Sequence, residues 1–142
     1  MSHLPYDASD DAILAFVDEW AELLAAEDYE QAFAFTAHIR GCTLTPDAFG
    51  RHIKLQAQHH AAGWDGSFGV LDSKHRVTRE GTPTHKSQVK DVTRWPKNAR
   101  GQIGEIWYDL NFDGYATDYT ATFEIHDDGE GLTIALIDIG VH

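Results

Sequence analysis

The chain has 142 residues, of which 42% are hydrophobic and 11% aromatic, and its formal net charge is −12. This length suits one domain with a real core, and the composition is that of a folded globule rather than a disordered tail. The negative charge argues against non-specific nucleic-acid binding, which requires cations to neutralise phosphates.

The single cysteine, Cys42, excludes an internal disulfide, and no apolar run is long enough to span a bilayer. The first residues also lack the pattern of a signal peptide. We therefore expect one cytosolic domain over residues 1–142, with no membrane partner.

Three helices are predicted over about residues 10–62. Ser9 precedes an apolar stripe with a period of 3.6 residues and has the features of an N-cap. Asp28 starts a second helix in a sequence that resembles a capping box. Thr45, followed by proline, predicts the start of a third helix, which Gly63 ends.

The remainder of the chain, about residues 66–142, is predicted to form strands. Asp113 and Gly114 are a tight-turn signal between two alternating runs, and this turn pairs Phe112 with Tyr115. Helices followed by adjacent strands predict an α+β fold, with three N-terminal helices packed on a curved, mostly antiparallel sheet.

The predicted register places three polar side chains in one row on a largely apolar sheet face. Tyr108 lies opposite Tyr119, and the next turn brings Asp138 beside Tyr119. A carboxyl group on a core face is costly unless it is paired or lines a cavity. Asp138, Tyr108 and Tyr119 are therefore the candidate catalytic residues, with Asp138 as general acid or base and a tyrosine hydroxyl stabilising an oxyanion. A purely structural hydrogen bond is the alternative, and a slip of one residue would move Asp138 to the other face.

Residues 12–35, with the core ILAFVDEWAELLAAEDYEQAFAF, resemble the opening of nuclear-transport-factor-2-like proteins, the SnoaL-like or cystatin-like cones. In those proteins a long helix leads through a short acidic turn and an aromatic residue to a second helix. Residues 104–123, GEIWYDLNFDGYATDYTATF, are similar to an uncharacterised bacterial group of unknown function. The resemblance implies a cone-like fold, a pocket between sheet and helices, and a homodimer formed through the sheet.

Binding of a small, partly apolar ligand in that pocket is the leading functional hypothesis. An acid–base enzyme of the isomerase or dehydratase type is one alternative. No cofactor is expected, because the chain has no glycine-rich phosphate loop and no nucleophile elbow. The residues expected to line the pocket come from the helices and the sheet: Trp20, Phe49, His52, Ile53, Ile106, Phe123 and Leu136.

The opposite sheet face carries a second candidate surface, formed by Glu105, Trp107, Asp109 and Asp118. The predicted register puts Asp109 directly across from Asp118, which is mildly unfavourable for like charges. A nearby cation, a bound metal or plain surface exposure would each account for the pair. This face also suits the second alternative, an acidic interaction module that neutralises a basic partner, as immunity proteins do.

Charge is unevenly distributed along the chain. Residues 74–100 hold eight of the 11 Lys and Arg against two acidic residues, a charge of +6, which leaves three basic and 21 acidic residues elsewhere, a charge of −18. This segment either complements the acidic surfaces or binds an anionic ligand or partner. The nine histidines form no metal-binding pattern, since His52, His59 and His60 of the third helix are not three or four residues apart. No metal site is expected.

Overall fold

The computed structural model of the chain describes residues 4–38, 44–65, 77–78, 88–112 and 115–141. The side chains of residues 57–65, 115, 116, 118 and 141 lie outside the described part, as do the predicted turn residues Asp113 and Gly114. The elements in chain order are α1 (Asp10–Ala25), α2 (Tyr29–Phe35), β1 (Ala37–His38), α3 (Pro46–Asp65), β2 (Val77–Thr78), β3 (Lys90–Arg94), β4 (Gln102–Phe112), β5 (Tyr115–Asp127) and β6 (Leu132–Val141).

The three predicted helix starts are confirmed. In each case the side-chain oxygen of Ser9, Asp28 or Thr45 accepts a hydrogen bond from the backbone N–H three residues later, at 3.1, 3.3 and 3.2 Å. These bonds satisfy donors that a helix start otherwise leaves without a partner. The third helix continues past Gly63 and ends at Asp65. Among the described residues, no helix is long and apolar enough to cross a membrane.

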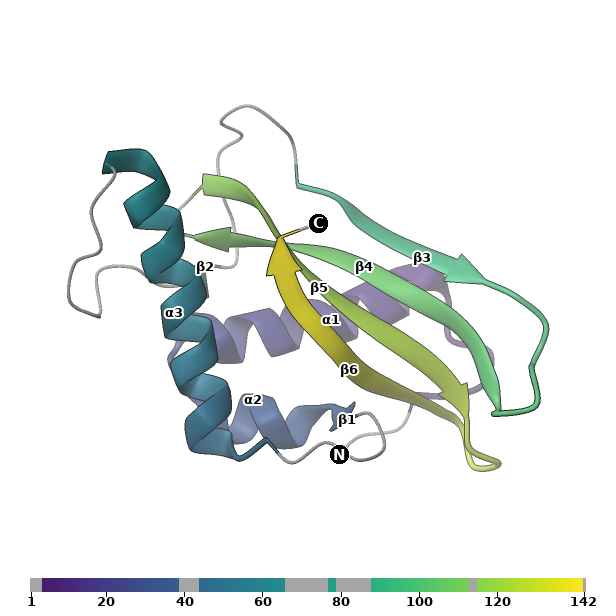
Figure 1. Cartoon of the computed structure of the whole chain (residues 1–142). Coiled ribbons are helices and arrows are strands. Elements are labelled where there is room, and N and C mark those ends of the chain that lie inside the picture. The colour runs from purple at the N-terminus through teal and green to yellow at the C-terminus, as the bar shows by residue number, and fades with distance from the viewer. Residues whose placement is uncertain (1–3, 39–43, 66–76, 79–87, 113–114, 142) are drawn as a thin grey trace.

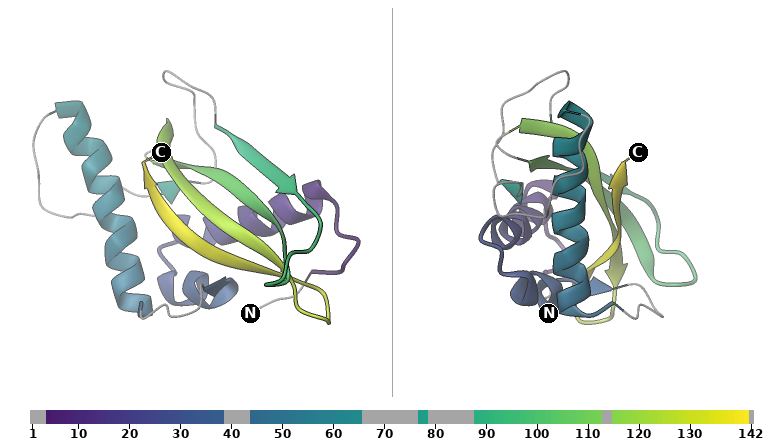
Figure 2. Two further views of the ribbon diagram at one scale, coloured as in Figure 1. Left: turned by 45° about the vertical axis from the view of Figure 1, so that its right-hand side comes forward. Right: turned by 60° about the vertical axis from the view of Figure 1, so that its left-hand side comes forward.

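The strands form one strongly curved sheet (Figure 1) in the order β1-β6-β5-β4, with β2 and β3 both pairing with β4. Helices α1 and α2 cover one face, and α3 stands beside α2 at an end of the sheet (Figure 2). We call the helix-covered side the inner face and the opposite side the outer face.

The α+β class is confirmed, but two details of the prediction, three N-terminal helices and a mostly antiparallel sheet, are matched only in part. Strand β1 lies between α2 and α3, so the helices do not all precede the strands. It pairs with β6 in parallel, whereas the other pairs in the described part are antiparallel, so the sheet is mixed. A two-residue strand such as Ala37–His38 is too short to show the alternation by which strands are recognised.

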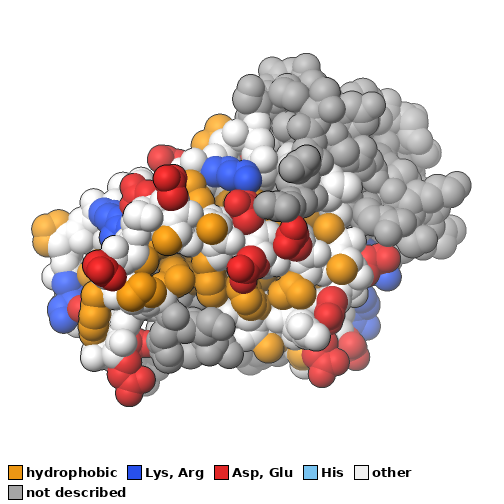
Figure 3. Space-filling model, turned by 180° about the vertical axis from the view of Figure 1, so that it is seen from behind, with side chains coloured by type: hydrophobic (Ala, Val, Ile, Leu, Met, Phe, Trp, Pro, Cys, Tyr) orange, Lys and Arg blue, Asp and Glu red, His pale blue; other side chains and the backbone are white. Residues whose placement is uncertain are grey.

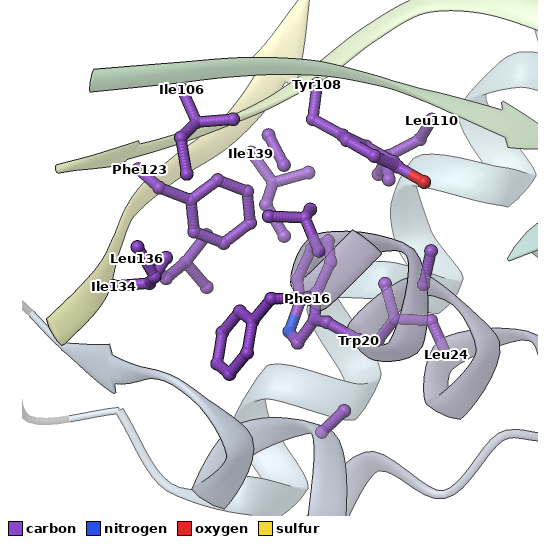
Figure 4. Packing of buried hydrophobic residues seen from close by; sticks show 14 of the residues in the cluster. Phe16, Trp20, Leu24, Ile106, Tyr108, Leu110, Phe123, Ile134, Leu136 and Ile139 are labelled. Atoms are coloured by element: carbon purple, nitrogen blue, oxygen red, sulfur yellow. The ribbon is translucent and has the colours of Figure 1, made fainter. Parts of the chain in front are cut away.

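The core lies between α1 and the inner face (Figure 4). Trp20 is completely buried and meets Phe123 edge-to-face, with ring centroids 5.1 Å apart. Burying a large apolar side chain contributes about 1.5–3 kcal/mol. The other labelled members come from α1, β4 and β6: Phe16, Leu24, Ile106, Tyr108, Leu110, Ile134, Leu136 and Ile139.

The register of β4 with β5 follows the prediction only at its turn end. Phe112 does pair with Tyr115. An irregularity then shifts the pairing by two residues, so that Asp109 lies opposite Thr120 and not opposite Asp118. A shift of two residues keeps every side chain on its own face, so the alternation of the sequence cannot reveal it.

A bulge in β6 moves Asp138 to the outer face. Phe123 pairs with Leu136 and Thr122 pairs with Asp138, so Ile137 is an extra residue on β6. The bulge reverses the alternation, because one additional residue turns all later side chains over. Asp138 is consequently exposed, and its predicted place on the core face is wrong.

Candidate functional site

The three predicted catalytic residues do not come together. Tyr108 is buried on the inner face and pairs with Ala121 in the sheet, whereas Asp138 is exposed on the outer face. Tyr119 pairs with Val141 and is half-buried, and this burial raises the pKa of its hydroxyl. The predicted row of one carboxyl and two hydroxyl groups is therefore not formed.

Tyr108 has a different carboxyl partner, on α1. Its hydroxyl donates to Asp18 Oδ1 at 2.5 Å, and Lys90 Nζ donates to the same oxygen at 2.8 Å. Lys90 Nζ also lies 5.0 Å from the centroid of the Tyr108 ring, in cation–π range. These contacts join α1 to β3 and β4, so the cluster has a clear structural role.

The residues predicted to line a pocket lie between the helices and the inner face of the sheet, where most of them belong to the hydrophobic core. Six of them are core members with at most 7% exposure: Trp20, Phe49, Ile53, Ile106, Phe123 and Leu136. His52 is half-buried, with Nε2 3.2 Å from the carbonyl oxygen of Ile139. The indole N–H of Trp20 has no hydrogen-bond partner among the described residues. These residues therefore form part of a packed core, into which Trp20 brings this N–H group.

A groove of about 710 Å³ opens instead on the outer face, near the β5–β6 turn. Four elements build it: the outward side chains of β5 and of β6, the edge strand β1, and the turn that precedes β4. We call it the outer groove, and its lining residues are Ala37, His38, Arg100, Glu124, His126, Thr133, Ala135 and Ile137. No helix lies in front of this face in Figure 1.

Glu124 and His126 form an ion-pair geometry in the outer groove. They are two residues apart on β5 and so share its outer face. The distance from His126 Nε2 to Glu124 Oε2 is 2.7 Å, and the two side chains are 29% and 24% exposed. The carboxylate thus orients the imidazole while both groups stay accessible to solvent.

Arg100 is held over the outer groove by a compact turn. Asn98 Oδ1 accepts hydrogen bonds from the backbone N–H groups of Arg100 and Gln102, both at 3.0 Å. Gly101 adopts φ +78°, a conformation that favours glycine. The guanidinium Nη2 donates to Gln102 Oε1 at 3.0 Å. Among the described residues, Arg100 has no carboxylate within ion-pair distance.

His38 closes the groove at the sheet edge. Its ring stacks on Phe33 with centroids 4.0 Å apart, and its Nε2 lies 2.6 Å from the Phe33 carbonyl oxygen. One ring nitrogen is thus engaged with the backbone of α2. The imidazole therefore has a fixed orientation where it lines the groove.

The predicted interaction surface begins beside the outer groove, because Glu105 lies directly across from Glu124. It needs one correction. Glu105 and Trp107 are exposed, as such a surface requires. Asp109 is completely buried and accepts hydrogen bonds from Val89 N at 3.0 Å, Trp107 Nε1 at 3.0 Å and Thr120 Oγ1 at 2.8 Å. It cannot contact a partner, and the side chain of Asp118 lies outside the described residues.

The basic segment partly complements acidic surfaces, as one of its two interpretations predicted. Lys90 pairs with Asp18 at 2.8 Å, and Arg94 Nε pairs with Asp10 at 2.7 Å, so two cations of β3 bind carboxylates of α1. Seen from the helix side (Figure 3), acidic side chains still outnumber basic ones around an apolar stripe. This view supports an acidic character for the helix-covered side of the molecule.

A second groove of about 520 Å³ lies where α2 and α3 begin. Its lining is strongly acidic and includes Glu27, Glu30 and Asp47. Asp28 and Thr45 also line it, but their side chains already cap the two helices. Among the described residues, no group of three His, Cys, Asp or Glu is placed to hold a metal ion.

The sequence did not single out the outer groove, although two signals were present. The spacing of Glu124 and His126 places them on one strand face. Arg100 is the last cation of the basic segment and directly precedes β4. No known protein family, curated protein or solved structure matches the chain, so its geometry alone must carry the functional argument.

Proposed function

We propose that the protein binds a small, partly apolar ligand in the outer groove. The observation that carries this proposal is a groove of about 710 Å³ whose apolar Ala37, Ala135 and Ile137 adjoin a few polar groups. Small-molecule sites have volumes of about 300–1,000 Å³ and combine mostly apolar walls with a few placed polar groups. The ligand class agrees with the sequence hypothesis, whereas the location differs from it.

The test is a fragment screen on ¹⁵N-labelled protein, read by NMR chemical-shift changes. We expect fragments to change the chemical shifts of the backbone amides of residues 133–137 in the wild type. Ala135→Phe fills the floor of the groove and should abolish these shifts. Ala15→Phe, the same change on the exposed side of α1, is the matched control and should leave them intact.

A different outcome would identify the inner face as the site. Fragments that shift the indole N–H of Trp20 and still bind Ala135→Phe would show binding in the core between α1 and the sheet. That result would overturn the outer-groove proposal and restore the pocket implied by the resemblance. Binding nowhere in the screen would overturn both.

We also propose, with the same resemblance as support, that the fold is the nuclear-transport-factor-2-like cone, that the protein is cytosolic, and that it forms a homodimer. The curvature of the sheet over α1 and α2 favours a cone (Figure 1). A single cysteine is consistent with a reducing compartment. Catalysis by Asp138 with Tyr108 or Tyr119 is not supported, because the three side chains are apart.

Docking of a basic protein is the second candidate function. The observation that favours it is that α1 and α2 contain no Lys or Arg, while Asp11, Glu19 and Glu22 are exposed. Its signature would be association with a basic polypeptide that weakens as ionic strength rises. Association that is insensitive to salt would contradict this candidate.

A further inference from the structure

We infer that the outer groove selects ligands that carry a carboxylate, and that Arg100 is the residue that binds it. This inference rests on the proposed function and adds the chemical class of the ligand. Within the basic segment, residues 74–100, Arg100 differs from three other cations. Lys90, Arg94 and Lys97 each have a carboxylate partner, at 2.8, 2.7 and 3.4 Å, whereas Arg100 has none among the described residues.

Arg100 is also prepared for binding before any ligand arrives. The turn at residues 98–102 fixes its backbone through Asn98 Oδ1, and Gln102 Oε1 holds one guanidinium nitrogen at 3.0 Å. Ordering a long, flexible side chain on binding costs free energy. A side chain that is already held avoids part of that cost, so the turn favours binding.

The shape and charge of the groove favour a carboxylate over a larger anion. A guanidinium can donate two parallel hydrogen bonds to a planar carboxylate. Glu124 shares the groove and would repel a second negative charge on the ligand. The apolar floor formed by Ala135 and Ile137 suits the hydrocarbon body of such an acid. The fitting ligand is therefore a small monocarboxylic acid with an apolar body.

Glu124 and Arg100 line the same groove, so the carboxylate of Glu124 partly offsets the positive charge that Arg100 presents to a ligand.

The test compares small carboxylic acids with their primary amides, for example benzoate with benzamide, by NMR titration of the full chain. We expect each acid to bind more tightly than its amide at residues 133–137. Arg100→Gln should weaken the acids by about tenfold to hundredfold, the range for a hydrogen bond to a charged group, and leave the amides unchanged. Lys97→Gln removes a neighbouring cation that does not line the groove and should change neither class.

Glu124→Gln provides a second variant with an effect of opposite sign. It removes the competing negative charge, so acids should bind several-fold more tightly. Acids that bind Glu124→Gln more weakly than the wild type would contradict the assigned role of this carboxylate.

The outcomes separate the two levels of the proposal. Acids and amides that bind the groove equally, with no effect of Arg100→Gln, would overturn the carboxylate inference and keep the proposed function. Acids and amides that both fail to shift residues 133–137 would overturn the inference and count against the proposed function as well. Loss of acid binding in Arg100→Gln but not in Lys97→Gln is the result that supports both.

Discussion

Asp109 and Glu124 are two of the carboxyl groups on the outer face of the sheet, and they have very different surroundings. Asp109 is completely buried, and among the described residues it accepts hydrogen bonds from Val89, Trp107 and Thr120, donors that the fold itself supplies. Glu124 is 24% exposed and faces an imidazole and an open groove. The two residues belong to adjacent strands of the same curved sheet.

The difference shows how surroundings separate a structural carboxyl from a candidate functional one. The donors around Asp109 come from Val89, Trp107 and Thr120, which join β4 to β5 and to the residues before β3. These hydrogen bonds hold strands together. Around Glu124 the neighbours are ionisable and solvent-accessible, so its bonding can change when a ligand arrives.

Asp109→Ala should have the largest effect on stability. It leaves three donors of Val89, Trp107 and Thr120 without their acceptor in a buried site, and each such loss costs about 1–3 kcal/mol. We expect a loss of at least about 3 kcal/mol in the free energy of unfolding, measured by urea denaturation. Glu124→Ala is the matched control and should change it by less than about 0.5 kcal/mol. Equal losses of unfolding free energy in the two variants would contradict the distinction between a structural Asp109 and an exposed Glu124.

Thr120→Val tests a single donor of the same site. The change keeps the shape of the side chain and removes only the hydroxyl that donates to Asp109 at 2.8 Å. We expect a loss of about 1 kcal/mol, the usual contribution of one hydrogen bond. Thr122→Val, on the same face but half-buried, should be close to neutral in the same urea assay. A neutral Thr120→Val would mean that the remaining donors are sufficient for Asp109.

The helices could be predicted from the sequence because their signals are local. The caps at Ser9, Asp28 and Thr45 each act over three residues, and the buried stripe of α1 follows from the 3.6-residue period. Phe49 and Ile53, four residues apart, lie on one face of α3 for the same reason, and each is 1% exposed. These features need no knowledge of distant parts of the chain.

The sheet details could not be predicted, because pairing depends on irregularities that leave no mark on alternation. One extra residue, Ile137, was enough to move Asp138 to the outer face. The outer groove depends on the parallel pairing of Ala37 with Ala135, almost a hundred positions apart in the sequence. Only the fold brings such residues together, so the candidate site was missed although its β5 members shared a strand.

Glu124→Gln tests whether the exposed carboxyl group of the pair contributes to stability. A solvent-accessible ion pair contributes about 0–1 kcal/mol, so the loss of the Glu124 charge should change stability by less than about 0.5 kcal/mol. His126 keeps an amide oxygen as a hydrogen-bond acceptor. Thermal unfolding at neutral pH is the measurement, and a large decrease in the unfolding temperature would assign Glu124 a structural role like that of Asp109.

The smallest expected effect concerns Asp127, which follows the groove residue His126 at the end of β5. The backbone N–H of Gly129, assisted by Tyr6 and Lys97, holds the pKa of this carboxyl below its ordinary value of 3.8. Because the folded pKa is lower than the unfolded one, the stabilisation is present above about pH 3.8 and is lost as the pH falls through the folded pKa. Asp127→Asn should therefore be slightly less stable than the wild type at neutral pH, and urea titrations should show the difference shrinking in acid. A difference that stays constant down to that range would mean that the charge of Asp127 does not contribute to the stability of this end of the sheet.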